Sequence, residues 1–394
     1  MKPNPRLIPR FNIDYTFVDL VTSLLNLRKS TNHKSMNDIF NSSVIFTNSG
    51  RMSLYLILKG LCLPEKSKIG IPLYSCPSNF DSIIYAGHVP VFLDVDLDNL
   101  TLDPMDLQSK IHDLDVIVVI HTFGRPADMD EIMCIAGDVP VIEDCAHALL
   151  SKYGDSLLGT MGTAGYFSFR SGKYISAGEG GMIVTSNKRL MDNIRAVLQN
   201  YSNESMIGEI KHAFKTYLRS ALYHRPWFGL VSLPIGSLVE KKVDIMNKYS
   251  FKVQNIRKTD LITISTKMLL FPQNVEKQRS NSSSMLKSVN CSLFRTFPEK
   301  KDTFCNYFLF PLVVQSKNTR DSAVVSLKRE GVDTTQLFSN VPLIAMKKYG
   351  YMRDCPNTEY LCERILTVPN HYTLKEKELE SIIKHINNFC DGSL

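Results

Sequence analysis

Short apolar runs alternate with amphipathic segments between residues 43 and 201, and this alternation constrains the fold more than any other feature of the chain. The apolar runs are rich in Val and Ile and are bounded by Gly or Pro; they predict strands at residues 43–47, 68–72, 89–93, 116–121, 139–143, 165–169 and 181–185. Helical patterns lie between several of them, at residues 51–61, 79–86, 104–112, 128–135 and 188–198. Strands that alternate with helices of this length predict an α/β fold, with a mainly parallel sheet flanked by helices on both faces.

Polar residues gather directly after several of these predicted strands. In open parallel sheets, ligands bind in the crevice beyond the carboxyl ends of the strands. The polar segments that follow strands are residues 48–50, 74–76, 121–124, 144–147 and 168–173. The sequence therefore predicts an active site at this edge of the sheet.

The alternation stops at residues 202–250, which we interpret as an insert in a large domain covering residues 1–265. Residues 266–394 predict a smaller C-terminal α+β domain. Within it we expect a Ser/Asn-rich turn, a strand, a helix and a closing helix, at residues 281–284, 307–314, 320–330 and from 373 onward. Thr373 and Glu376 have the spacing of a capping box for the closing helix.

Composition narrows the class of protein. The chain has 394 residues and a net charge of +7, from 46 basic and 39 acidic residues spread along it. This balance suits an anionic substrate, but there is no concentrated basic stripe, so we expect no nucleic-acid binding. The nine cysteines include no CxxC pair, which favours reduced thiols in a cytoplasmic protein and no metal site. We expect neither a signal peptide nor a membrane span.

Lys173 stands between the apolar run 165–169 and the glycine-rich turn 178–181. A lysine that attacks a carbonyl must first lose its proton, which burial and nearby positive charge favour. Pyridoxal phosphate (PLP) also needs an acid beside its pyridine nitrogen, and Asp144 follows the predicted strand 139–143. By spacing alone, an ordinary solvated lysine is the better interpretation, so the pair depends on the other motifs.

A second group of residues could hold a phosphate. Residues 47–51 join a strand to a helix, so the N–H groups of Gly50 and Arg51 would lie at a helix N-terminus, where anions are stabilised. Ser168 could add a hydroxyl, and His147, three residues after Asp144, could donate to the ring hydroxyl of the cofactor. Taken singly, these residues fit a helix cap, a solvent-facing serine and a structural histidine equally well.

Together and in this order, the motifs resemble the DegT/DnrJ/StrS family of PLP-dependent sugar aminotransferases, from about residue 43 to the end of the chain. The motifs that carry the resemblance are NSG at 48–50, PLYS at 72–75, AG at 86–87 with VFLDVD at 91–96, HTFGRPADM at 121–129, EDCAHA at 143–148, FSF at 167–169 with Lys173 and GEGG at 178–181, NIRKTDL at 255–261, CPNTE at 355–359 and LTVPNH at 366–371. The family's fold is an aspartate aminotransferase-like PLP domain with a small C-terminal domain, in agreement with the pattern above.

The resemblance implies a role for each site residue. Lys173 would bond the cofactor and move protons, Asp144 would pair with the ring nitrogen, and His147 would approach the ring hydroxyl. The phosphate would be held by Ser49, Gly50, Arg51 and Ser168.

Five further positions extend the implied site, and one of them departs from the family. Asn255 would reach the phosphate of the partner subunit, which implies a homodimer with shared active sites. Cys76 occupies the position of the family's stacking aromatic residue, with Phe80 the nearest substitute. Substrate contacts are expected from Tyr74, His121 and Arg257.

The implied activity is transfer of an amino group from an amino acid, which we expect to be glutamate, to a nucleotide-linked keto sugar for amino-sugar or polysaccharide biosynthesis. One alternative is a lipid-linked or cyclitol ketone, because aromatic and basic residues at 214–238 could rest on a membrane surface. We favour packing at a dimer interface or an active-site flap for that segment, since it lacks one clean amphipathic face. Another alternative, prompted by Cys76, is a non-catalytic protein on the same fold.

Overall fold

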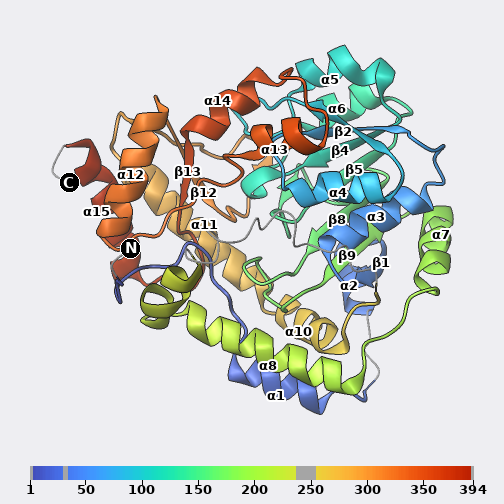
Figure 1. Cartoon of the computed structure of the whole chain (residues 1–394), viewed down its shortest axis with the longest axis horizontal. Helices are drawn as coiled ribbons and strands as arrows, with labels where there is room; N and C mark the ends of the chain where they lie inside the picture. The colour runs from blue at the N-terminus through green and yellow to red at the C-terminus, as the bar shows by residue number, and fades with distance from the viewer. Residues whose placement is uncertain (1–2, 30–33, 237–253, 392–394) are drawn as a thin grey trace.

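The computed structural model describes residues 3–29, 34–236 and 254–391 and is built around one seven-stranded sheet (Figure 1). Its strands lie in the order β1-β9-β8-β5-β4-β2-β3. Their bounds are β1 Ser43–Thr47, β2 Lys68–Pro72, β3 Val89–Leu93, β4 Val116–Ile120, β5 Val141–Asp144, β8 Ala164–Ser168 and β9 Gly181–Thr185. The pairs β2/β3, β2/β4, β4/β5 and β5/β8 are parallel, and only β9 runs against its neighbours. The predicted α/β fold with a mainly parallel sheet is confirmed.

Helices cover both faces of this sheet, because the central strands are apolar on both sides. Successive side chains of a strand point to opposite faces, so Val116 and Val118 join one core while Ile117 and Val119 join the other. The first core is covered by α3 Gly50–Gly60, α4 Pro77–Tyr85 and α7 Lys188–Leu198, with α2 Lys34–Phe40 at its margin. The second is covered by α5 Pro104–Lys110 and α6 Met129–Ala136.

The C-terminal part forms a second layer around a three-stranded antiparallel sheet in the order β10-β12-β13. Its core is made by side chains of this sheet and of three helices, including Leu312, Leu327 and Ile382. The elements are α11 Phe271–Ser288, β10 Phe294–Arg295, β12 Phe310–Val314, α12 Lys317–Arg329, α13 Val341–Lys348, α14 Pro356–Arg364, β13 Ile365–Val368 and α15 Glu376–Cys390. A small sheet of β11 Thr303–Phe304, β6 Lys152–Tyr153 and β7 Ser156–Leu157 connects this part to the large sheet.

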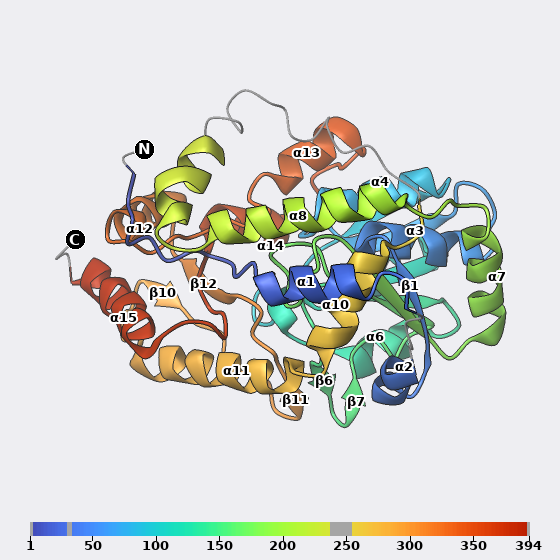
Figure 2. The ribbon, with the colours of Figure 1, turned by 90° about the horizontal axis from the view of Figure 1, so that it is seen from below.

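Three helices lie across the lower side of the molecule in Figure 1 and face the viewer in Figure 2: α1 Phe17–Leu25, α8 Met206–Tyr223 and α10 Lys258–Met268. Within the predicted insert, α8 is followed by a short helical turn, Phe228–Ser232, and residues 237–250 lie outside the described part of the chain. The helix α10 runs across the predicted domain boundary at residue 265, so this boundary stays a prediction. Among the described residues, no helix is long and apolar enough to cross a membrane.

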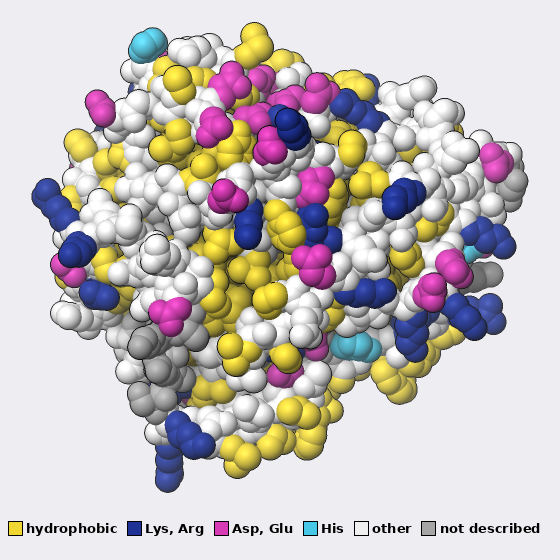
Figure 3. Space-filling model, turned by 180° about the vertical axis from the view of Figure 1, so that it is seen from behind, with side chains coloured by type: hydrophobic (Ala, Val, Ile, Leu, Met, Phe, Trp, Pro, Cys, Tyr) yellow, Lys and Arg dark blue, Asp and Glu magenta, His cyan; other side chains and the backbone are white. Residues whose placement is uncertain are grey.

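The surface agrees with the spread of charge seen in the sequence. On the face shown in Figure 3, basic and acidic side chains are mixed, and neither sign forms a continuous stripe.

The predicted turn at residues 281–284 is wrong, because this segment lies inside α11. Its polar side chains bond without breaking the helix: the Ser282 hydroxyl donates to the Gln278 carbonyl one turn earlier, and Asn281 donates to the carbonyl of His371. The predicted capping box is also wrong. Thr373 bonds His371 instead, and α15 starts after Lys375, whose N–H donates to the carboxylate of Glu378.

The prediction of reduced thiols fails at two of the nine cysteines. Cys291 and Cys390 form a disulfide with their Cα atoms 5.7 Å apart. They come together because α11 and α15 pack side by side, which places the segment after α11 next to the end of α15. Spacing in the sequence does not reveal this pair, since 99 residues separate the two cysteines.

Candidate active site

The fold brings several predicted site residues to one edge of the sheet. Asp144 is the last residue of β5, and Ser168 is the last residue of β8. These two strands are parallel neighbours, so their carboxyl ends lie together. The N-terminus of α3 joins them there, since Ser49 bridges Gly180 in the turn that follows Lys173.

Lys173 is held in a tight turn after β8. Its N–H donates to the Arg170 carbonyl at 2.9 Å, and its Nζ lies 5.3 Å from the centre of the Phe308 ring. The pKa of Lys173 is lowered to about 8: burial is the largest cause and the guanidinium of Arg170 acts in the same direction, while Asp144 and Cys76 oppose them. Such an amine has a usable unprotonated fraction near neutral pH, as a nucleophile requires.

Asp144 is a buried carboxylate fixed by three donors. Its Oδ1 accepts from the N–H of Ala146 at 2.9 Å, and its Oδ2 accepts from Asn79 Nδ2 at 2.9 Å and from the Tyr166 hydroxyl at 2.7 Å. These bonds set the direction of the carboxylate without neutralising its charge. A fixed negative charge beside Lys173 suits the protonated nitrogen of a pyridine ring.

His147 is a neutral hydrogen-bond donor in this arrangement. Its Nδ1 accepts from the N–H of Phe123 at 3.4 Å, so the hydrogen of the neutral ring is on Nε2. Burial moves the pKa of His147 well below its ordinary value, and the nearby charge of Lys173 acts in the same direction. The ring of Phe308 stacks on the imidazole with centres 4.6 Å apart.

The start of α3 forms a cradle for an anion. Ser49 caps the helix by accepting from the N–H of Met52, and Arg51 lies in the first turn. A Cβ added at Gly50 would lie 3.0 Å from the Cβ of Ser168, so only glycine lets the helix end and the serine hydroxyl approach each other this closely. Backbone N–H groups at a helix N-terminus with an adjacent hydroxyl fit a phosphate. Together with Lys173 and Asp144, these residues fit PLP.

Gly50→Ala is expected to weaken binding of PLP roughly tenfold, because the new methyl group meets Ser168 and pushes the cradle open. Titration of the apoprotein with PLP, followed by absorbance, measures the dissociation constant. Gly236→Ala is the matched control, since a Cβ there has no neighbour within 4 Å. Equal affinity in the two variants would show that the cradle does not hold the phosphate.

The rate at which PLP attaches to the apoprotein is expected to rise with pH through about 8 and then to level off, because only the unprotonated amine of Lys173 reacts. Stopped-flow absorbance after mixing with PLP gives this profile. Arg170→Gln removes a positive charge that lowers the pKa, so its midpoint should move to higher pH. A flat profile between pH 6 and pH 10 would contradict the assignment of Lys173, whose amine changes protonation in about this range.

Two of the expected substrate contacts are engaged within the protein. The hydroxyl of Tyr74 donates to the carbonyl of Leu337 at 2.9 Å, and the Tyr74 side chain is fully buried. His121 is also buried: its Nδ1 accepts from the N–H of Ala127 and its Nε2 faces the carboxylate of Glu143. Both residues are therefore bonded within the protein, and neither offers a free polar atom to the site.

A buried cluster near the sheet has the composition of a metal site but is satisfied by other bonds. One ligand atom each from His121, Glu143 and Cys145 lies within 4.8 Å of the others. The Glu143 carboxylate, however, accepts three backbone N–H groups in addition to His121. We therefore interpret the cluster as an anchor for the loop after β7.

The aromatic neighbour of the site is Phe308, which sequence reasoning missed. Phe80, the nearest substitute for Cys76 in the sequence, is fully buried against Phe92 and Tyr349 and does not take that part. Cys76 is half-buried at the start of α4, and its Sγ lies 3.0 Å from the hydroxyl of Ser78. Phe308 comes from the C-terminal part, in the loop before β12, and stood in the sequence as one more apolar residue of a predicted strand.

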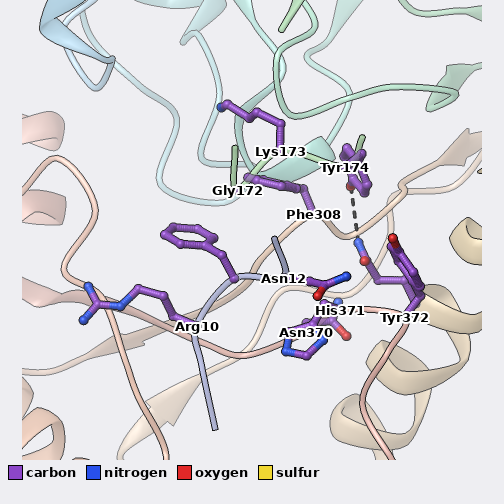
Figure 4. A pocket seen from close by; sticks show the side chains of 11 residues that line it. Arg10, Asn12, Gly172, Lys173, Tyr174, Phe308, Asn370, His371 and Tyr372 are labelled. Carbon is purple, nitrogen blue, oxygen red and sulfur yellow. Dashed lines mark hydrogen bonds between the residues drawn. The ribbon is translucent and has the colours of Figure 1, made fainter. Parts of the chain in front are cut away.

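A small cavity of about 20 Å³ is lined by Lys173 and Phe308 together with residues of the N-terminal segment and of the loop before α15, including Asn12, Asn370 and His371 (Figure 4). The side chain of Lys173 points away from Asn12, Asn370 and His371, and Phe308 lies between them. Asn12 Nδ2 and Asn370 Oδ1 are buried and have no hydrogen-bond partner among the described residues. Residues 10–12 precede the motifs of the sequence analysis, which is why this wall of the cavity was not foreseen.

Asn255 and Arg257 bond residues outside the group formed by Lys173, Asp144 and Ser168. The amide of Asn255 donates to the Tyr201 carbonyl at 2.8 Å and to Asn203 at 3.0 Å. Arg257 pairs with Glu179, the charged residue of the glycine-rich turn, at 2.5 Å. Arg257 therefore supports the turn that follows Lys173, while its buried Nε has no hydrogen-bond partner among the described residues.

Comparison with known proteins gives a consistent result. Residues 38–220 and 249–387 match the DegT/DnrJ/EryC1/StrS aminotransferase family. GDP-perosamine synthase of Escherichia coli O157:H7 is 25% identical over 346 residues, which cover 87% of this chain and 84% of that protein. L-glutamine:2-deoxy-scyllo-inosose aminotransferase of Micromonospora echinospora is 33% identical over 174 residues, 42% of this chain and 41% of that protein.

The fold is also found among solved structures. A Streptococcus pneumoniae protein solved in its PLP form superposes with a TM-score of 0.77 at 17% identity, covering 98% of this chain and 100% of that one. At this level of identity the likeness extends to the fold.

Proposed function

The chain belongs to the DegT/DnrJ/EryC1/StrS aminotransferase family, and we propose that it uses PLP to move an amino group from glutamate to a nucleotide-linked keto sugar. The observation that carries this proposal is the meeting of three groups at one edge of the sheet. These are the amine of Lys173 with its lowered pKa, the fixed carboxylate of Asp144, and the cradle between Gly50 and Ser168. An amine, an acid and an anion site in this order match the aldehyde, ring nitrogen and phosphate of PLP.

When bound, PLP supplies an electron sink for the carbon from which a proton is removed. Asp144 would hold the ring nitrogen protonated and oriented, and the Nε2–H of His147, whose Nδ1 is already bonded to Phe123, would donate to the ring hydroxyl. The amine of Lys173 would act as the base that takes the proton from the donor carbon and would hold it for its return. The ring of Phe308 covers His147 and excludes water from that side of the site.

Two observations favour a nucleotide as part of the proposed substrate. GDP-perosamine synthase is named for a nucleotide-linked sugar, and this chain carries a net charge of +7 that favours anionic substrates. If the nucleotide is recognised, a free nucleoside diphosphate should raise the apparent KM for the keto sugar and leave kcat unchanged. GDP, UDP and dTDP are tested in turn, and failure of all three to inhibit would count against a nucleotide-linked acceptor.

A cyclitol ketone is the second candidate acceptor, favoured by the match to the 2-deoxy-scyllo-inosose enzyme over part of the chain. Such a substrate carries no nucleotide. Turnover of 2-deoxy-scyllo-inosose that no nucleoside diphosphate inhibits would favour this candidate over the first.

We further infer that two copies of the chain share their active sites, with Asn255 completing the phosphate site of the partner. The support is the family resemblance. Within its own chain the Asn255 amide bonds Tyr201 and Asn203 and does not reach Ser168 or Gly50 in any hydrogen bond among the described residues. Lys173→Ala and Asn255→Ala, each inactive alone, are then expected to recover roughly a quarter of wild-type activity after mixing, because half the dimers contain both variants and one intact site. No recovery after subunit exchange, checked by mass, would contradict shared sites.

A further inference from the structure

The helices α1 and α8 lie side by side and present one continuous apolar surface. Figures 1 and 2 both show them as neighbours at the lower side of the molecule, and the rings of Phe17 and Tyr217 meet at 6.0 Å between them. Hydrophobic side chains gather along the same lower margin in Figure 3. The large exposed side chains of this α1–α8 surface are Phe17, Val18, Val21, Leu25, Met206, Ile207, Ile210, Phe214 and Leu218.

The exposed fractions of these side chains are high for apolar residues on a protein surface. Leu25 is 75% exposed, Ile207 66% and Phe214 53%. Scattered apolar residues on a surface need no explanation, but two adjacent helices with nine of them on one side mark an interaction surface. On α8 they recur at the helical spacing of residues 207, 210, 214 and 218.

The exposed charged side chains on the two helices of the α1–α8 surface are all basic. The nearest acidic neighbours, Glu179 and Glu204, are both ion-paired with Arg257. Lys211, Lys215 and Arg219 form an exposed basic row along α8, and Arg28 and Lys29 follow the end of α1. These basic residues are held beside the apolar row because four residues make about one helical turn.

Both acidic residues of the two helices face inward. Asp19 pairs with Lys267 of α10 at 3.1 Å, and Glu209 is buried, accepting the N–H groups of Lys258 and Thr259 at the start of α10. No acidic side chain of α1 or α8, both fully described, therefore lies exposed beside the apolar row.

The inner face of α8 is firmly attached, so its outer face is a permanent feature. His212 bonds Asp260 at 2.7 Å, and Ser220 bonds the backbone of Ile13 and Tyr15. Gly178 packs against the Thr216 hydroxyl, which ties α8 to the turn that follows Lys173. The α8 helix thus has one side on the catalytic turn and the other on the exposed surface.

We propose that the α1–α8 surface binds peripherally to a membrane rich in anionic phospholipid, with its apolar row in the headgroup region and its basic row on the lipid phosphates. The pattern is that of an interfacial amphipathic helix, with large apolar side chains on one strip and Lys and Arg beside it. The surface differs from the segment 214–238 considered from the sequence, because α1, far away in the chain, supplies nearly half of it.

A second copy of the chain is the other occupant to consider, and the charges argue against it. If two copies packed through this surface about a twofold axis, the interface would gather five basic residues from each copy, and neither helix has an exposed acid to pair with them. An anionic bilayer neutralises the same charges.

The test uses the PLP-loaded full chain and vesicles of phosphatidylcholine, alone or mixed with phosphatidylglycerol. The wild-type protein should float with the mixed vesicles, stay behind with pure phosphatidylcholine, and be released by high salt. The double variants Phe214→Ser with Leu218→Ser, and Lys211→Glu with Lys215→Glu, should each bind mixed vesicles at least about tenfold less. Val325→Ser with Met352→Ser, at exposed apolar positions elsewhere, should bind like the wild type.

Two further measurements decide whether the α1–α8 surface binds a membrane or a second copy of the chain. Each variant should keep the wild-type rate of amino transfer from glutamate, which shows that the fold is intact, and the wild-type mass by light scattering. Absence of wild-type binding to mixed vesicles overturns the proposal. So does a fall in subunit number in the Phe214 and Leu218 variant without any change in vesicle binding, since the surface would then join copies of the chain.

Discussion

Lys173→Ala is expected to lower amino transfer at least about 1,000-fold, because one substitution removes both the bond to PLP and the group that moves the proton. The variant should also lose the visible absorbance of attached cofactor. Burial already disfavours the charged form of this lysine, as its lowered pKa shows, so its removal should not weaken folding. Turnover is measured with glutamate and a keto acid, and stability by thermal unfolding of the apoprotein.

Two controls separate loss of the amine from loss of structure. Lys188→Ala, on the exposed side of α7, should behave as the wild type in both measurements. Small primary amines in solution should restore part of the activity of Lys173→Ala, since they replace the missing base. Wild-type turnover and a normal absorbance band in Lys173→Ala would remove the lysine from the mechanism.

Asp144→Asn is expected to lower turnover roughly 100- to 1,000-fold, because an amide keeps the shape of the side chain but not the charge that holds a proton on the pyridine nitrogen. The amide would also place its own N–H₂ group against Asn79 or the hydroxyl of Tyr166, both of which donate to the carboxylate. Single-turnover kinetics with glutamate report the loss at the first proton transfer.

A graded series tests the same point. Tyr166→Phe removes one of three donors and leaves the charge of Asp144, so its loss should be much smaller than that of Asp144→Asn. Asp155→Asn, in the exposed turn between β6 and β7, is the control for a change of charge alone. Turnover of Asp144→Asn within threefold of the wild-type rate would contradict the part assigned to this carboxylate, for which an order of magnitude or more is expected.

The large sheet could be predicted because its signal is local. Each strand is a short apolar run whose side chains enter two cores, and each helix carries its own periodicity. The turn expected at residues 281–284 shows where local signals fail. Ser and Asn favour turns when their side chains bond nearby backbone, but Ser282 and Asn281 bond within and across the fold and leave α11 intact.

The sequence could predict those site residues that directly follow or end a strand of the parallel sheet. Asp144 and Ser168 end adjacent strands, as the pattern of a parallel sheet requires. His121 has the same position in the pattern, yet Ala127 and Glu143 occupy both of its nitrogens, which only the folded chain reveals.

Phe308 could not be found from the sequence for a different reason. It reaches His147 because the C-terminal part packs on the large sheet, a contact between residues 161 positions apart. The cavity wall from residues 10–12 depends on a similar long-range contact, since Arg10 is held by both carboxylate oxygens of Asp333. Contacts of this range leave no periodic trace in the sequence.

Transfer of isotopically labelled nitrogen from glutamate is the most direct test of the proposed reaction. The purified protein is incubated with PLP, labelled glutamate and a panel of nucleotide-linked keto sugars, and the products are read by mass spectrometry. We expect the label in the amino group of at least one nucleotide-linked sugar, and no label with Lys173→Ala. Label in a nucleotide-free cyclitol alone would contradict the proposed acceptor, and no label in any ketone would contradict the proposed reaction.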